Sequence, residues 1–113
     1  ALFTFIQTVK LDHIVWKGEV YAIASGSSKQ SMDSLDDQTS CRLGKWYKTD
    51  GKAQFINNSA FRNLEEPHKQ MHKAGIEALT LIASGDKMQA IEQLNKMEMA
   101  SESIMHILDQ LIA

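Results

Sequence analysis

The residues best suited to bind a metal in this chain are three of its histidines and its single cysteine. His68 and His72 are four residues apart in PHKQMH, so on a helix both project from one face, about one turn apart. This spacing can bring two imidazole nitrogens to one zinc ion. Cys41 begins the stretch CRLGKWY and cannot form a disulfide within its own chain. It is a buried small hydrophobe, a reactive thiol or a metal ligand.

A third histidine, His13, falls where the helical pattern calls for an apolar residue. Histidine is a poor core residue unless its ring nitrogens find partners, so a hydrogen-bonded core histidine is one interpretation. The other is a ligand, since His13, His68, His72 and Cys41 together offer three nitrogens and one thiolate. These donors form a complete tetrahedral set for Zn²⁺. The fourth histidine, His106, has no partner at ligand spacing, and we predict that it lies outside the site.

The elements that must position these residues are predicted to be helices. The chain has one proline, Pro67, and almost no alternation of β-branched residues. The pattern predicts an all-α fold, an antiparallel four-helix bundle with a short extra helix or turn that carries the cysteine motif. A first helix is expected from about Phe3 to about Ser25. Its inward stripe is Ile6, Val9, His13, Trp16, Val20 and Ile23.

Further along the chain, residues 25–40 are rich in Ser, Asp and Gln and predict a surface connection, with a helix start near Asp36 or Asp37. TDGK, residues 49–52, predicts a turn, and INNSAF, residues 56–61, offers Asn or Ser as a helix cap. A second long stripe consists of Phe61, Leu64, His68, Met71, Gly75, Leu79 and Ile82. Pro67 predicts a kink or a fresh helix start there.

A last helix is predicted after Gly85 and Asp86, which supply the stop and start signals. Its inward face is expected to carry Met88, Ile91, Leu94, Ile104, Leu108 and Leu111. The remaining apolar residues of the terminal helices are candidates for dimer contacts: Phe3, Phe5, Met97, Met99 and Ile112.

Near Cys41, Gly44 is expected to let another helix come close, and Trp46 and Tyr47 to seal the site from water.

Composition narrows the class of protein. A length of 113 residues fits one domain spanning 1–113, and a net charge of −2 gives no basic field for nucleic acid. One cysteine fits a reducing compartment, so we expect a cytoplasmic protein. No apolar run reaches the ~18 residues of a membrane span, so no membrane contact is expected. The chain begins without methionine and lacks a signal peptide, so we interpret it as a fragment of a longer protein.

Three motifs in order resemble the chemoreceptor zinc-binding domain, or CZB, family. They are HIVWK (13–17), CRLGKWY (41–47) and PHKQMH (67–72), so the resemblance spans about residues 12–72. It implies zinc bound by His13, Cys41, His68 and His72 in a helical bundle that pairs as a homodimer. It also implies attachment to the effector domain of a bacterial signalling protein, a soluble chemoreceptor or a diguanylate cyclase. In these proteins the domain is regulatory and responds to zinc or to oxidants such as hypochlorous acid, with Cys41 as the redox-reactive residue.

Other functions remain open at this point. A hydrolytic zinc enzyme would keep one coordination position open for water, and Lys69 stands where a zincin places its glutamate, so we expect no enzyme. A helical homodimerisation module is the main alternative, with hydrogen-bonded histidines or with a purely structural zinc site. Haem binding is a third interpretation that ligand type alone leaves open, although the chain has no CxxCH motif.

Overall fold

The computed structural model describes residues 1–113 and contains helices and no strand. The three long helices are α1 (Leu2–Ser25), α5 (Glu65–Ala83) and α6 (Lys87–Leu111). Four short ones connect α1 to α5: the 3₁₀ helix η1 (Met32–Ser34), α2 (Arg42–Lys48), α3 (Asp50–Phe55) and α4 (Ser59–Asn63). The prediction of an all-α bundle with a short helix at the cysteine motif is confirmed, although three long helices form the bundle in place of the predicted antiparallel four.

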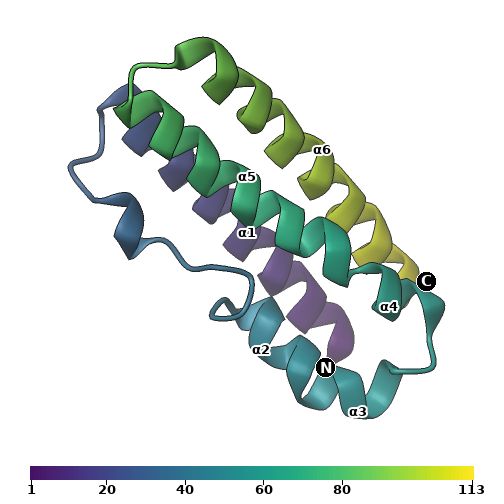
Figure 1. Ribbon diagram of the computed structural model, residues 1–113. Helices are drawn as coiled ribbons and strands as arrows, with labels where there is room; N and C mark the ends of the chain where they lie inside the picture. The colour runs from purple at the N-terminus through teal and green to yellow at the C-terminus, as the bar shows by residue number, and fades with distance from the viewer.

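The long helices lie side by side in an elongated bundle of 44 × 22 × 19 Å (Figure 1). Helix α5 packs against both α1 and α6, runs antiparallel to α6 and points in the same direction as α1. The segment that connects the end of α1 to the start of α5 therefore has to return along the length of the bundle. It does so through residues 26–41 and α2, which places the cysteine motif beside α1.

The apolar stripes predicted for the first two long helices form the core. On α1 the buried members are Ile6, Val9, His13, Trp16 and Val20. From α4 through the junction residue Leu64 to α5 they are Phe61, Leu64, His68, Met71, Gly75 and Leu79. Spacing of three and four residues keeps such side chains on one helix face, so each stripe can meet its neighbour along its whole length. The histidines are therefore held at fixed places between packed helices.

Helix boundaries near the site follow from local chemistry. The side chain of Asn58 accepts hydrogen bonds from the backbone N–H groups of Ala60 and Phe61 and so caps α4. Helix α5 then begins afresh at Glu65, which places Pro67 in the first turn, where its missing N–H costs no hydrogen bond. After α5, Gly85 adopts φ 89° and the Asp86 carboxylate caps α6, as predicted.

Two local predictions are wrong. No helix starts at Asp36 or Asp37, because the Asp37 carboxylate accepts from the N–H groups of Thr39 and Ser40 and closes a turn instead. TDGK is likewise not simply a turn. The helical structure is interrupted only at Thr49, and Asp50 already begins α3.

The inward face of α6 is also different from the prediction in its first half. Met88 is 81% exposed and Ile91 is 57% exposed, while Ala90 and Met97 are buried. Helix α5 presents Gly75 and Ala78 to its neighbours, and this close approach selects small or flexible side chains on α6. Met97 is thus a core residue and not a dimer contact, whereas Ile104, Leu108 and Leu111 are buried as expected.

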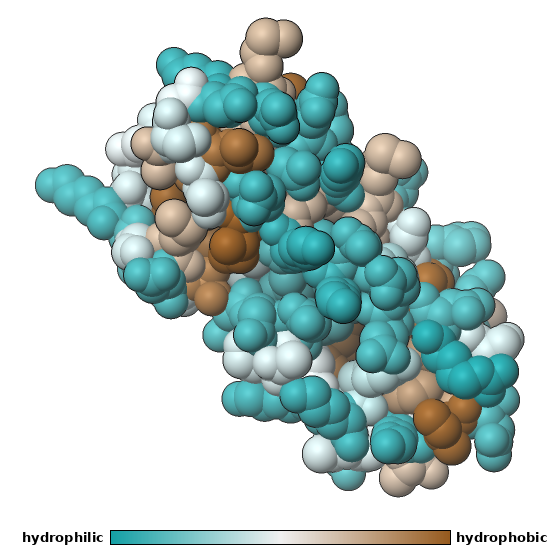
Figure 2. Space-filling view, viewed as in Figure 1, coloured by the Kyte–Doolittle hydropathy of each residue, from teal (hydrophilic) through white to brown (hydrophobic).

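Much of the surface is polar. On the face seen in Figure 2, hydrophilic side chains dominate the middle and apolar ones form separate patches. Helix α1 lies behind α5 in this view, and it carries the exposed apolar residues Phe3, Leu11, Ile14 and Val15. None of the helices combines the length and the apolar character that crossing a membrane requires.

Candidate metal centre

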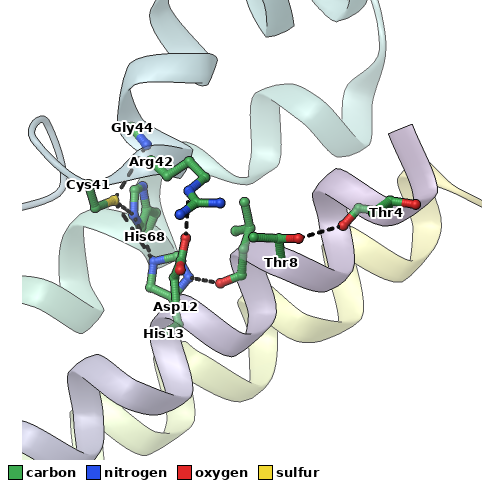
Figure 3. Close-up of polar contacts among 9 residues, drawn as sticks. Thr4, Thr8, Asp12, His13, Cys41, Arg42, Gly44 and His68 are labelled. Carbon is green, nitrogen blue, oxygen red and sulfur yellow. Dashed lines mark hydrogen bonds and ion pairs between the residues drawn. The ribbon is translucent and has the colours of Figure 1, made fainter. Parts of the chain in front are cut away.

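The structure brings the four predicted ligands together. His13 comes from the middle of α1, Cys41 from the residue before α2, and His68 and His72 from successive turns of α5. All four side chains are buried, and their ligand atoms lie within 4.8 Å of one another. Figure 3 shows His13, Cys41 and His68 converging from three different segments of the chain.

The distances between donor atoms suit one small cation. Nε2 of His13 and Nε2 of His68 are 3.3 Å apart, and Sγ of Cys41 lies 3.2 Å from Nε2 of His68 and 4.0 Å from Nε2 of His13. A tetrahedral zinc ion with ordinary bond lengths requires about 3.3 Å between two nitrogens and about 3.6 Å between nitrogen and sulfur. The three distances are therefore close to the edge lengths of such a tetrahedron, with the donor atoms at its corners.

Hydrogen bonds fix which nitrogens face the centre. Nδ1 of His13 donates to the carbonyl oxygen of Val9, and Nδ1 of His72 donates to that of Asp36, both over 2.9 Å. In a neutral imidazole the other nitrogen, Nε2, then carries a lone pair. Nε2 of His72 is buried and has no hydrogen-bond partner in the protein. Such an orphaned acceptor is costly in a core unless a cation lies beside it, so the donor set fits a metal.

The protonation states also suit ligands. Burial, followed by the charges of His72 and His13, lowers the pKa of His68 to about 3. Burial lowers the pKa of His72 to about 4 and lowers that of His13 as well. The imidazoles are thus neutral at physiological pH, and neutral imidazole is the form that binds a metal. Burial raises the pKa of the Cys41 thiol, so the sulfur needs a nearby cation to become a thiolate.

Cys41 is positioned by the start of α2. Its backbone is extended, with φ −73° and ψ 163°, and its sulfur accepts from the N–H of Gly44 at 3.4 Å. A Cβ on Gly44 would collide with the carbonyl group of Gln38. The expectation that Gly44 admits another helix is therefore wrong. It admits the turn that precedes Cys41, so that the sulfur can cap its own helix.

Trp16 forms the aromatic wall of the site, whereas the prediction had assigned this role to Trp46 and Tyr47. The Trp16 ring lies 4.4 Å from the His72 ring, and its Nε1 donates to the same Asp36 carbonyl as His72. Trp46 packs instead against Phe5, Phe55 and Phe61, and Tyr47 stacks on Phe61. Trp16 belongs to the inward stripe and to HIVWK, and this was the only sequence signal for its role.

An ion pair and a cavity complete the surroundings. The Arg42 guanidinium lies 3.2 Å from the Asp12 carboxylate (Figure 3). Arg42 directly follows Cys41 in the sequence, and Asp12 directly precedes His13. Both residues line a cavity of about 450 Å³ that also reaches Cys41, His13 and His72. His106 is exposed on α6, forms a hydrogen bond with Gln110 and is not part of the cluster, so its predicted position outside the site is confirmed.

Comparison with known proteins agrees with this geometry. The family model of the chemoreceptor zinc-binding domain matches residues 13–79, more than half of the chain and a range that contains all four donors. No curated protein and no solved structure matches the chain.

Proposed function

Since the chain belongs to the chemoreceptor zinc-binding domain family, we propose that it is a regulatory zinc module of a bacterial signalling protein, governed by the state of Cys41. His13, Cys41, His68 and His72 hold the ion. The observation that carries this proposal is the convergence of four buried donors, one of them the orphaned Nε2 of His72. Cys41 fills the fourth position that a hydrolytic enzyme keeps for water, so the arrangement favours regulation over catalysis.

Cys41 is the residue through which the site can respond to an oxidant. When zinc is bound it keeps the sulfur as a thiolate, which is both a strong ligand and a nucleophile. The thiolate reacts with hypochlorous acid to give the sulfenic acid and a chloride ion, the sulfur losing the two electrons that the chlorine gains. The cavity beside Asp12 and Arg42 supplies a path, because Cys41 lines it although its side chain is only 8% exposed.

The response would be a loosening of the segment around Cys41. A sulfenic acid is a weaker donor than a thiolate, so Cys41 would no longer be anchored to the histidines. Removal of zinc would have the same effect, because the ligands come from three separate segments. The long helices are held by their apolar stripes and would persist. We therefore propose an order–disorder change over residues 36–50 as the switch.

Hydrogen exchange tests this switch on zinc-loaded, zinc-free and oxidised protein. Amides of residues 36–50 are expected to lose protection in the last two states, while those of α5 keep it. The Cys41→Ser variant treated with the same oxidant is the control, because the exposed Met88 and Met99 can also be oxidised. Equal protection of residues 36–50 in all three states would exclude the switch. Metal analysis of untagged protein, with about one zinc expected per chain, tests the site itself.

Pairing with a second copy is a further part of the proposal. Leu11, Ile14 and Val15 are 62%, 55% and 70% exposed, and together they form an uncharged apolar face on α1. Exposed apolar faces of this kind mark interaction surfaces. Sedimentation should show a dimer that Leu11→Glu dissociates, whereas Met88→Glu at the start of α6 leaves it intact. A dimer equally stable in both variants would exclude this face. The effector domain would be another part of the same parent protein, a soluble chemoreceptor or a diguanylate cyclase.

A further inference from the structure

One of the three histidines lacks the hydrogen bond that the other two have. His13 and His72 each donate Nδ1–H to a backbone carbonyl, whereas the contacts of His68 all run through its Nε2. No protein group accepts a hydrogen bond from its Nδ1, although the residue is only 4% exposed. Histidines that bind metals almost always donate this second N–H to a carboxylate, a carbonyl or water. Nδ1 of His68 is not one of the fully buried atoms without a partner, so it is open to solvent, and its acceptor is water or a bound ligand.

The ring of His68 lines a cavity of about 370 Å³ where α2, α3 and α5 meet. The charged residues of its lining are Lys48, Lys52, Lys69 and Glu65. The ion pairs of the protein are formed by Lys10, Lys17 and Arg42, so the three lysines of the cavity form none. Three cations and one carboxylate leave an excess of positive charge in the cavity that the His68 ring lines. The cavity thus favours an anion.

The rest of the lining favours an organic anion over an inorganic one. Tyr47, Ile56 and Phe61 also line the cavity, and Tyr47 stacks on Phe61 with the two ring planes 8° apart. This wall can cover a hydrocarbon group, and the lysines of the lining can neutralise an acidic one. A volume of about 370 Å³ is within the range of small-molecule sites.

We propose that this cavity binds a small organic carboxylate, which accepts the Nδ1–H of His68 through one oxygen and is neutralised by Lys48, Lys52 and Lys69. The coupling to zinc rests on the proposed function, because it requires His68 to be a ligand. A carboxylate on Nδ1 makes Nε2 a stronger donor. The anion and zinc should therefore strengthen each other's binding by the same factor.

Benzoate is a suitable probe, since it joins a carboxylate to an apolar ring. Calorimetric titration of zinc-loaded protein should show saturable binding, and ¹⁵N spectra should show a shift at Nδ1 of His68. Zinc affinity, measured by competition with a chelator, should rise about tenfold at saturating benzoate, the low end of the effect of such histidine partners. Chloride at the same ionic strength should produce neither effect, and inorganic phosphate should bind more weakly than benzoate.

Two variants separate this cavity from general charge effects. Lys48→Gln combined with Lys52→Gln should abolish benzoate binding and leave zinc affinity without benzoate unchanged, because neither lysine is a zinc ligand. Lys29→Gln combined with Lys87→Gln removes the same charge far from the cavity and should bind benzoate as the parent does. Absence of saturable benzoate binding, or equal binding by the two double variants, would overturn the proposal.

Failure of the proposed function would look different. Benzoate binding is measured on zinc-free protein as well, so the cavity is tested whether or not zinc binds. A protein that binds benzoate but takes up no zinc refutes the zinc module and the coupling, and supports the carboxylate site alone. A protein that binds zinc but not benzoate refutes the carboxylate site and leaves the zinc module standing.

Discussion

Replacing Gly75 with alanine should weaken zinc binding although Gly75 is not a ligand. A Cβ at this position would lie 2.6 Å from Cη2 and 2.8 Å from Cζ3 of Trp16, and 3.1 Å from Sδ of Met97. Ordinary carbon–carbon contacts are about 3.5–4.0 Å, so the Trp16 ring must move by about 1 Å. That ring packs on His72 and donates to the Asp36 carbonyl, which also orients His72. The displacement therefore reaches a ligand through a single side chain.

The magnitude follows from comparing two glycines. Gly18 lies inside α1, and a Cβ there would meet nothing within 4 Å, so Gly18→Ala should gain the usual helix preference of about 1 kcal/mol. Gly75→Ala gains the same term and suffers overpacking of about 1–3 kcal/mol. The difference in the free energy of unfolding between the two variants isolates the steric term. Disturbing a group that orients a ligand lowers metal affinity about 10- to 100-fold, and we expect this range for Gly75→Ala.

Two measurements test the reasoning. Urea unfolding of the zinc-free proteins gives the stability difference, and competition with a chelator gives zinc affinity for both variants and the parent. Tryptophan fluorescence should change in Gly75→Ala and not in Gly18→Ala. If Gly75→Ala is as stable as Gly18→Ala and binds zinc like the parent, Trp16 does not connect α5 packing to the site and the argument is wrong.

Three further predictions concern the ligands themselves. Cys41→Ser should weaken zinc binding strongly in a chelator competition, since a hydroxyl is a poor substitute for thiolate, while His106→Ala should leave it unchanged. The zinc-free domain should lose stability as pH falls below about 6.5. In the unfolded chain the two histidines then bind protons, whereas in the folded protein His68 and His72 stay neutral down to their lowered pKa values of about 3 and 4. Each group should contribute up to about 1.4 kcal/mol per pH unit in urea titrations, and pH-independent stability would refute this. Gly44→Ala should displace the turn before Cys41 and lower zinc affinity, and an unchanged affinity would show that this turn does not position the sulfur.

The donor set could be predicted from sequence because periodicity and chemistry agreed on it. His13 and His68 fall in apolar stripes, and a buried imidazole needs a partner, so each position was informative by itself. The spacing of His68 and His72 then fixed two donors on one helix face. Such local patterns survive folding because helix geometry alone decides which side chains share a face.

What surrounds the donors could not be predicted, because it depends on backbone atoms and on close approach. The acceptors for His13 and His72 are the carbonyls of Val9 and Asp36, and every residue has a carbonyl. The prediction that Met88 and Ile91 face inward on α6 is wrong for a related reason. Both are apolar and have the spacing of an inward helix face, yet both are exposed, because α6 packs on the small residues of α5 through a different face. Contacts between elements override a periodic pattern where small residues let backbones approach.

The Asp36 carbonyl makes the ligands interdependent. No residue of 26–40 is buried, so this segment has little apolar attachment of its own, and its Asp36 carbonyl receives hydrogen bonds from Trp16 and His72. Asp36 precedes Cys41 by five residues, so release of the sulfur frees the segment that orients His72. A ring without its Nδ1 acceptor is a weaker and less fixed donor. Loss of Cys41 therefore weakens a second ligand on a different helix, and zinc affinity should fall by more than the loss of one donor would cause.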